Sequence, residues 1–388
     1  MISTYVTEAM QSSSWIRKMF EVGQELKKKY GVENVYDLTL GNPIIEPPDE
    51  FFEVLEMLSL NKSSGMHRYM SNAGFTEVRE RIANHLTKKN LLKTDFKHII
   101  MTVGAAGGMN VILRTILNPG DEVIIFAPYF AEYLFYTQNH QGKIVISETT
   151  EDFDLDLDDL DRKITTKTKA IIINSPNNPT GKTYSEEKIN GLVDLLSMRQ
   201  KKMKRPLFLI SDEPYREIVF DDIVVPSVVA KYKNSFLVYS WSKSLSIPGE
   251  RIGYIAVNPN MDDVDTVIDG LIFCNRILGF VNAPATMQLA VSNLLTATVR
   301  IKYYKEKRDR IYQALTAYGY DVVKPTGTFY VFPKCPTADE LEFIERAKSE
   351  RVLVVPGVGF GRSGYFRISY STDDRTIEKA LDQFGKLI

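Results

Sequence analysis

Short apolar runs alternate with amphipathic stretches through the middle of the chain, and this alternation constrains the fold more than any other feature. The runs are rich in β-branched residues, which favours strands, whereas Ala105–Leu117 and Glu186–Gln200 have helical periodicity. The turn Asn118-Pro119-Gly120-Asp121 ends the first of these helices. The pattern predicts an α/β fold in which a mostly parallel sheet is flanked by helices. The predicted strands are Ile99–Val103, Glu122–Phe126, Lys143–Ile146, Lys169–Asn174, Leu207–Ser211, Phe236–Ser240 and Ile252–Val257.

The pattern changes from about Pro284. A long charged helical stretch reaches Tyr318 and ends at Gly319, short strands follow, and the chain closes with a helix. We therefore predict a second, smaller α+β domain, and we expect the N-terminal segment to fold onto it. The predicted large domain spans residues 45–283, and the predicted small domain combines residues 1–44 with 284–388.

Composition and charge exclude several classes of partner. The 48 basic and 49 acidic residues leave a formal net charge of -1, so no overall field attracts nucleic acid or anionic lipid. No run of about 18 apolar residues is present to span a membrane. Cys274 and Cys335 lie far apart without a C-x-x-C spacing, which argues against a disulfide framework or a zinc site. We expect a cytoplasmic protein that binds neither nucleic acid nor membrane.

An acidic stretch imitates a calcium-binding loop, because Asp152, Asp154 and Asp156 have the spacing of its first ligands. The imitation fails, since Leu157 stands where the loop needs glycine and Lys163 where it needs the final glutamate. The four histidines also lack the spacing of a metal pair. We predict no metal site.

Residues capable of chemistry follow the ends of two predicted strands. Lys243 stands in Tyr239-Ser240-Trp241-Ser242-Lys243-Ser244, and Arg251 lies eight residues further on. A lysine there can form an imine with an aldehyde cofactor while hydroxyls and an arginine hold a phosphate, although an isolated lysine of this kind is more often a surface residue. Asp212 follows Leu207–Ile210, where it can pair with a protonated pyridine nitrogen or cap the next helix.

Two loops complete this set of motifs. In Asn174-Ser175-Pro176-Asn177-Asn178-Pro179-Thr180-Gly181 an amide side chain can donate to a phenolate oxygen, but the loop equally suits a turn with a helix cap. Val103-Gly104-Ala105-Ala106-Gly107-Gly108 joins a strand to a helix, where small residues let backbone N–H groups approach a phosphate. It matches neither the Walker loop nor the dinucleotide fingerprint. Neither loop identifies a function alone.

Taken in order, these motifs resemble those of the class I/II aminotransferases, pyridoxal-phosphate enzymes with the aspartate aminotransferase fold (fold type I). The similarity extends from about Leu38 to Ser371. It implies pyridoxal 5′-phosphate as cofactor, and amino acids and 2-oxo acids as substrates. The residues that carry it are Gly41-Asn42-Pro43, Tyr69 with Gly74 and Arg79, Gly104-Ala105-Ala106, Pro128-Tyr129-Phe130, Asn178-Pro179-Thr180-Gly181, Asp212-Glu213-Pro214-Tyr215, Ser240-Trp241-Ser242-Lys243, Arg251 and Arg367.

The resemblance implies catalytic roles for Lys243, Asp212 and Tyr215. Lys243 is similar to the lysine that bonds to the cofactor aldehyde and then moves the proton between the substrate Cα and the cofactor. Asp212 is similar to the partner of the pyridine nitrogen, and Tyr215 and Asn178 match the donors to the ring O3′ oxygen. The other residues implied to bind cofactor are Gly104, Ala105, Ala106, Phe130, Ser240, Ser242, Arg251 and, from the neighbouring subunit, Tyr69.

Substrate binding is implied for Gly41, Asn42 and Arg367, of which Arg367 matches the arginine that clamps the α-carboxylate. The role of Tyr69 implies a homodimer with shared active sites. The implied reaction moves the amino group of an L-amino acid, aspartate or aromatic, to 2-oxoglutarate by a ping-pong mechanism through a Lys243 aldimine. The alternative is a pyridoxal-phosphate-dependent C–S β-lyase or an ACC-synthase-like lyase, which would share the lysine and the arginine.

Two positions leave the preferred donor open. Ala105 and Ala106 stand where the family often has a hydroxyl or a lysine, so phosphate binding rests on main-chain donors and no lysine is present there for a distal carboxylate. Arg276 lies about one residue from the position at which some dicarboxylate-specific members reach across the dimer.

Overall fold

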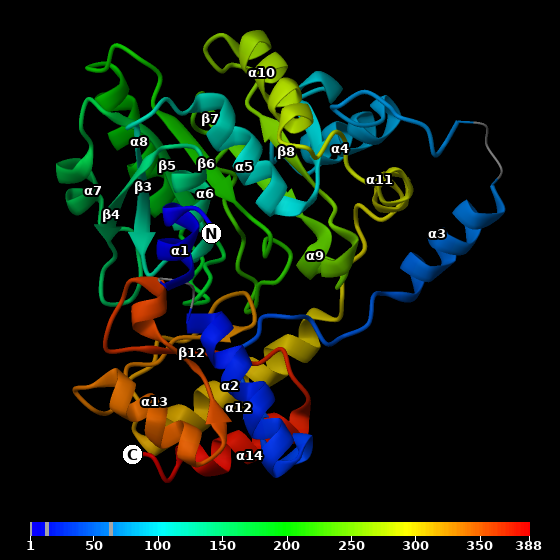
Figure 1. Ribbon diagram of the computed structural model, residues 1–388. Helices are drawn as coiled ribbons and strands as arrows, with labels where there is room; N and C mark the ends of the chain where they lie inside the picture. The colour runs from blue at the N-terminus through cyan, green and yellow to red at the C-terminus, as the bar shows by residue number, and fades with distance from the viewer. Residues whose placement is uncertain (1, 12–14, 62–64) are drawn as a thin grey trace.

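The computed structural model describes residues 2–11, 15–61 and 65–388. These residues form two bodies, a larger one built on a seven-stranded sheet and a smaller one of helices and short strands (Figure 1). Segments from both ends of the chain meet in the smaller body. The predicted domain ranges also include residues 1, 12–14 and 62–64, which lie outside the described residues.

The sheet of the larger body has the strand order β2-β8-β7-β6-β5-β3-β4. β8 is antiparallel to both of its neighbours, and the adjacent pairs without β8 are parallel. The predicted mostly parallel sheet is therefore confirmed, and each strand begins and ends within two residues of a predicted run. The strands are β2 (Ile99–Thr102), β3 (Glu122–Ala127), β4 (Lys143–Glu148), β5 (Thr168–Asn174), β6 (Phe208–Asp212), β7 (Ser235–Ser240) and β8 (Gly253–Val257).

Helices cover both faces of this sheet. Val123 and Ile125 of β3 pack with α5 (Gly104–Ile116) and α10 (Val264–Ile277), whereas Ile124 and Phe126 pack with α8 (Glu186–Gln200). Because alternate residues enter different cores and both cores are apolar, the strands have unbroken apolar sequences. The other helices of the larger body are α3 (Asp49–Leu60), α4 (Thr76–Lys88), α6 (Glu132–Asn139), α7 (Leu157–Lys163), α9 (Trp241–Ser244) and α11 (Ala285–Ser292).

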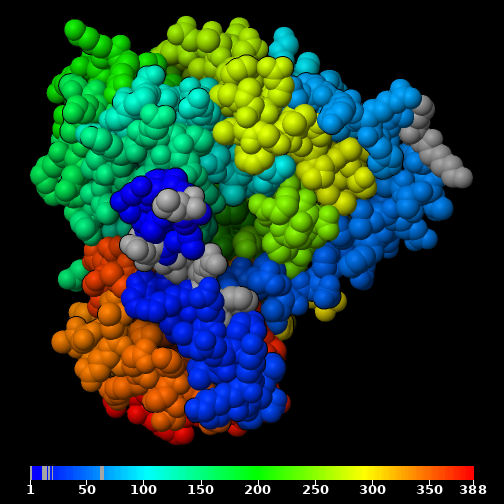
Figure 2. Space-filling model, viewed as in Figure 1, coloured from blue at the N-terminus to red at the C-terminus, as the bar shows by residue number. Residues whose placement is uncertain are grey.

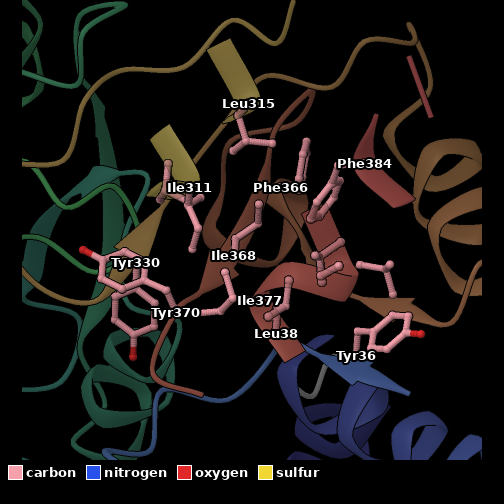
Figure 3. Close-up of a cluster of buried hydrophobic side chains, with 14 of the residues drawn as sticks. Tyr36, Leu38, Ile311, Leu315, Tyr330, Phe366, Ile368, Tyr370, Ile377 and Phe384 are labelled. Atoms are coloured by element: carbon pink, nitrogen blue, oxygen red, sulfur yellow. The ribbon is translucent and has the colours of Figure 1, made fainter. Parts of the chain in front are cut away.

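The smaller body has a core of its own, in which Leu315, Phe366, Ile377 and Phe384 point toward one another (Figure 3). Its β12 pairs antiparallel with β9 and β11. β1 pairs parallel with β10, so the N-terminal segment folds onto this body as expected. Its elements are α2 (Trp15–Tyr30), β1 (Tyr36–Asp37), α12 (Ile301–Tyr318), β9 (Tyr330–Val331), α13 (Glu340–Ser349), β10 (Val352–Leu353), β11 (Val355–Pro356), β12 (Phe366–Ser369) and α14 (Asp374–Phe384).

One part of the N-terminal segment leaves the smaller body. Helix α1 (Thr4–Gln11) lies against the larger body, where the Tyr5 hydroxyl donates to Asn139 Oδ1 of α6 at 3.0 Å (Figure 1). The N-terminal segment therefore touches both bodies through successive helices.

The prediction of a single long helix from Pro284 to Tyr318 is wrong, because α11 and α12 occupy this stretch with a break between them. Met287 of α11 lies in the core of the larger body, whereas Tyr304 of α12 lies in the core of the smaller body. The chain crosses between two cores here, which one straight helix could not do. On this packing we propose that the domain boundary lies near residue 298, after the predicted boundary at 284.

Candidate active site

A cavity of about 350 Å³ lies at the edge of the sheet where β5, β6 and β7 end in Asn174, Asp212 and Ser240. Figure 2 shows this face of the molecule hollowed between the N-terminal segment and α9. Open parallel sheets bind their ligands at this edge. Both bodies line the cavity, through Gly41, Ala105, Ala106, Met109, Phe130, Glu132, Tyr133, Tyr136, Asn174, Asn178, Asp212, Pro214, Tyr215, Ser240, Ser242, Lys243, Pro248, Arg251, Tyr330 and Arg367.

Lys243 lies on α9, directly after β7. Ser240 caps this short helix by accepting a hydrogen bond from the Ser242 backbone N–H at 3.1 Å. Nζ of Lys243 donates to the backbone oxygen of Gly41 at 2.8 Å. Burial lowers the pKa of Lys243 to about 8, and the positive charges of Arg251 and Arg367 contribute. An amine with this pKa is suited to attack on an aldehyde and to proton transfer.

Asp212 ends β6 inside the cavity. Its Oδ2 accepts a hydrogen bond from the Tyr133 hydroxyl at 2.5 Å, whereas its Oδ1 is buried without a partner among the described residues. Burial raises the pKa of Asp212 to about 7, and the Tyr133 hydrogen bond opposes this rise. A buried carboxylate oxygen without a donor fits a cationic donor placed in the cavity, as the protonated ring nitrogen of pyridoxal phosphate would be.

Tyr215 and Asn178 also reach the cavity. The Tyr215 hydroxyl shares a hydrogen bond with the Tyr330 hydroxyl at 3.1 Å, and Asn178 Oδ1 accepts from Arg367 Nη1 at 3.0 Å. Asn174 fixes the loop by accepting from the Asn178 backbone N–H at 2.8 Å. Within the described part of the chain no hydrogen bond engages Nδ2 of Asn178, so its N–H groups can donate to a ligand, which fits the phenolate oxygen of the same cofactor.

The glycine-rich turn closes one part of the cavity. Gly104 begins α5 with φ +73°, and a Cβ at this residue would lie 2.7 Å from Nη2 of Arg251. Ala105 and Ala106 line the cavity in the first turn of α5, where free backbone N–H groups attract anions.

Hydroxyls and a guanidinium accompany this helix terminus. The side-chain oxygens of Ser240 and Ser242 lie 2.7 Å apart, and Nη2 of Arg251 donates to the backbone oxygen of Val103 at 3.4 Å. All three side chains line the cavity. A positive helix end with two hydroxyls and an arginine is a donor set that fits a phosphate group.

Arg367 on β12 brings the smaller body into the cavity. Its Nη1 donates to Asn178, and its Nη2 donates to the backbone oxygen of Thr39 at 2.5 Å. The guanidinium carbon lies 4.4 Å from the ring centroid of Tyr330 and 4.8 Å from that of Phe360. Its Nε is buried without a partner among the described residues. A guanidinium held between two rings with an unused donor fits an incoming carboxylate.

The structure brings most of the sequence-predicted residues to this cavity, and it leaves three of them off its lining: Gly104, Asn42 and Tyr69. Gly104 directly precedes the lining Ala105, and Asn42 faces the smaller body, where its backbone oxygen accepts from Ser371 Oγ at 2.8 Å. Tyr69 is 91% exposed. Arg276, considered for a distal carboxylate, is also exposed, with its guanidinium 5.4 Å from the Phe273 ring.

Sequence reasoning missed several lining residues, of which the most informative are Glu132, Tyr133, Tyr136 and Tyr330. A signal for two of them was present, because Tyr133 and Tyr136 follow Phe130 at helical spacing and so share a face. Tyr330 had no such signal, since its place beside Tyr215 depends on how the two bodies pack.

Residues 33–384 match the family described as aminotransferase class I and II. The chain belongs to this family. A probable aspartate aminotransferase from Methanocaldococcus jannaschii is 33% identical and covers 89% of this chain and 91% of its own length. Aromatic-amino-acid aminotransferase 2 from Thermococcus litoralis is 30% identical and covers 98% of this chain and 96% of its own length.

Solved structures of aminotransferases have the same fold. An aminotransferase from Eubacterium rectale superposes with a TM-score of 0.96 at 40% identity and covers 100% of this chain and 98% of its own. Aspartate aminotransferase from Thermus thermophilus, solved with maleate, superposes with a TM-score of 0.87 at 29% identity, and the match covers 97% of each chain. Class I and II aminotransferases depend on pyridoxal phosphate, and the donors described above fit that cofactor.

The described residues contain no cluster of three or more histidine, cysteine, aspartate or glutamate side chains arranged to hold a metal ion. None of the helices in residues 2–11, 15–61 and 65–388 is both long enough and apolar enough to cross a bilayer.

Proposed function

We propose that this aminotransferase moves the amino group of aspartate or an aromatic amino acid to 2-oxoglutarate in two half-reactions on one cofactor. The names of its relatives, which include aspartate, aromatic-amino-acid and aspartate/prephenate aminotransferases, support this choice of donor. The observation that carries the proposal is that Lys243, Asp212 and Arg367 line one cavity.

Arg367 binds and orients the substrate through its α-carboxylate. The guanidinium is fixed by Asn178, by the backbone of Thr39 and by the two flanking rings, so it loses little freedom when the carboxylate arrives. Because Arg367 is buried, the new ion pair forms away from water and is stronger than a surface pair.

Lys243 moves the proton at the substrate Cα. With its pKa lowered from 10.5 to about 8, roughly a tenth of this amine is neutral at pH 7, far more than for an ordinary lysine, and the neutral amine can accept that proton. Pyridoxal phosphate, when bound, supplies an electron sink for the electron pair left on the substrate carbon. Asp212 would hold the ring nitrogen of the bound cofactor and favour its protonated form, and the Tyr133 hydroxyl fixes the carboxylate by donating to Oδ2.

The test is an absorbance titration of the purified holoenzyme with a panel of amino acids. Conversion of the cofactor to its amine form, with release of the matching 2-oxo acid, is expected for aspartate or the aromatic amino acids. Release of pyruvate and ammonia from cystathionine, without the amine form, would favour the C–S β-lyase instead and overturn the proposal.

We also propose a homodimer with shared active sites. Tyr69 is 91% exposed and lies off the cavity of its own chain, which suits a residue that serves a neighbouring subunit. Phe52, Met57 and Leu60 expose apolar side chains on α3, which lies at the margin of the larger body (Figure 1). Exposed apolar groups gathered on one helix favour a protein interface. The cytoplasmic location stays a prediction from the sequence.

A further inference from the structure

One charged side chain in the cavity has no role in the proposed function. The charged lining residues are Asp212, Lys243, Arg251, Arg367 and Glu132, and the first four serve the cofactor or the α-carboxylate. No hydrogen bond or ion pair joins the Glu132 side chain to another residue in the described ranges 2–11, 15–61 and 65–388. Burial raises its pKa, because the carboxylate loses water without gaining a partner.

A structural role at the helix end does not account for this position. Glu132 lies in the first turn of α6, where an acidic residue complements the helix dipole. Glu187 in the first turn of α8 has that role too, but it is exposed. Glu132 instead lines the cavity, where its carboxylate loses part of the hydration that an exposed acid keeps, and this loss is unfavourable.

The surroundings of Glu132 are aromatic and apolar. Helix α6 directs Glu132, Tyr133 and Tyr136 to the cavity, and Met109 and Pro248 also line it. Tyr136 lies four residues after Glu132 on the same face of α6, and both side chains line the cavity.

The bound substrate leaves this part of the lining for its side chain. In the proposed function Arg367 binds the α-carboxylate and Lys243 acts at the Cα, while Asp212 and Arg251 would hold the ring nitrogen and the phosphate of the cofactor. What remains is a largely apolar surface with one carboxylate that needs a donor. Among the described residues that line the cavity, the three cations are already engaged, so a second substrate carboxylate would meet the charge of Glu132 without a free cation beside it.

We infer that Glu132 is a specificity-determining residue that accepts a hydrogen bond from the far end of an aromatic substrate side chain. Its charge makes the second carboxylate of aspartate, and of 2-oxoglutarate as acceptor, bind less favourably than it would without Glu132. This inference rests on the proposed function and narrows its donor to aromatic amino acids that end in O–H or N–H, with tyrosine as the simplest case. A hydrogen bond to a charged acceptor gives a preference for tyrosine over phenylalanine of about tenfold or more.

The test compares kcat/KM for tyrosine, phenylalanine and aspartate in wild type, Glu132→Gln and Glu132→Leu. The ratio of tyrosine to phenylalanine is expected to fall about tenfold in Glu132→Leu. Both variants are expected to use aspartate and 2-oxoglutarate several-fold better, because the repelling charge is gone. The matched control is Glu187→Gln, which removes an exposed first-turn acid that does not line the cavity and is expected to leave all ratios unchanged.

A binding measurement separates this inference from the proposed function. Calorimetry on the holoenzyme gives the dissociation constants of 3-(4-hydroxyphenyl)propanoate and 3-phenylpropanoate, which lack the reacting amino group. We expect the hydroxyl compound to bind about tenfold more tightly in wild type and to lose this advantage in Glu132→Leu. Equal ratios in wild type and both variants would overturn the inference. Failure of every amino acid to convert the cofactor would instead overturn the proposed function.

Discussion

Lys243 and Asp212, which both line the cavity, have pKa values shifted toward 7, one from above and the other from below. Burial lowers the pKa of Lys243 to about 8 and raises that of Asp212 to about 7. The same loss of water disfavours the ammonium form of Lys243 and the carboxylate form of Asp212, so both charges are unfavourable in the cofactor-free cavity. A cofactor that bonds to the amine and brings a protonated nitrogen to the carboxylate relieves both costs.

The first prediction concerns stability of the cofactor-free protein. The pKa of Asp212 is about 7 in the folded state and near 3.8 in the unfolded chain, so the folded state holds this proton more tightly. Its contribution to stability is therefore full below about pH 4 and is lost as the pH rises through about 7. The Asp212→Asn variant has no titrating group at this position. The wild-type free energy of unfolding, measured in urea, should therefore fall relative to that of the variant between pH 4 and pH 8. An identical difference at both pH values would contradict the assignment.

The second prediction concerns Asp212 with cofactor present. Asp212→Ala removes the partner of the ring nitrogen, and we expect Cα deprotonation to slow roughly 100-fold and cofactor retention to weaken. Stopped-flow absorbance with a deuterated amino acid isolates the deprotonation step. Unchanged rates for this step would show that Asp212 does not contact the ring.

At this scale the sequence predicted the residues whose chemistry depends on local motifs, such as Lys243 after a strand and Asp212 before Glu213-Pro214-Tyr215. It did not predict Tyr330, which reaches the cavity through a contact between distant segments. Tyr330 shares a hydrogen bond with Tyr215, 115 positions away. No spacing rule within one motif contains such a pair, whereas Tyr133 could have been found from its helical spacing to Phe130.

Among the elements, the turn that begins α5 requires glycine at its first helical residue. Gly104 and Gly120 both have positive φ, at +73° and +85°, so alanine costs each a similar strain of about 1 kcal/mol. A Cβ on Gly104 would press on Arg251, whereas a Cβ on Gly120 would meet no atom within 4 Å.

The third prediction follows from this pair. Gly104→Ala should weaken cofactor binding at least tenfold by displacing Arg251, because a charge-assisted hydrogen bond contributes about 1.5–3 kcal/mol. Gly120→Ala should lose similar stability and keep the cofactor affinity of wild type. Fluorescence titration of both cofactor-free variants with pyridoxal phosphate gives the comparison. Equal weakening in both variants would rule out a contact of Arg251 with the phosphate.

The elements themselves were predictable where one residue pattern decided them. The strands of the large sheet are buried on both faces, so their apolar runs are continuous and easily found. The break between α11 and α12 was missed, because helical residues continue on both sides of it and only the passage between two cores interrupts the helix.

For the whole molecule, the arrangement that most needs testing is the sharing of sites between subunits. Tyr69→Ala and Lys243→Ala should each lose nearly all activity as pure proteins. Dimers assembled from one copy of each contain one site with both residues intact.

The fourth prediction is that unfolding and refolding the two variants together restores about a quarter of wild-type activity, since half of the dimers are mixed and each has one intact site. Activity no higher than the average of the pure variants would exclude a shared site. Refolding Lys243→Ala with Asp212→Ala is the matched control. Both residues belong to one chain, so no mixed dimer contains an intact site.

Reduction of the holoenzyme with borohydride, followed by peptide mapping, shows directly whether Lys243 bonds to the cofactor. We expect a phosphopyridoxyl group on the amine of Lys243, and no stable modification in Lys243→Ala. Enzyme saturated with pyridoxal phosphate and reduced in this way, yet unmodified at Lys243, would contradict this role of Lys243.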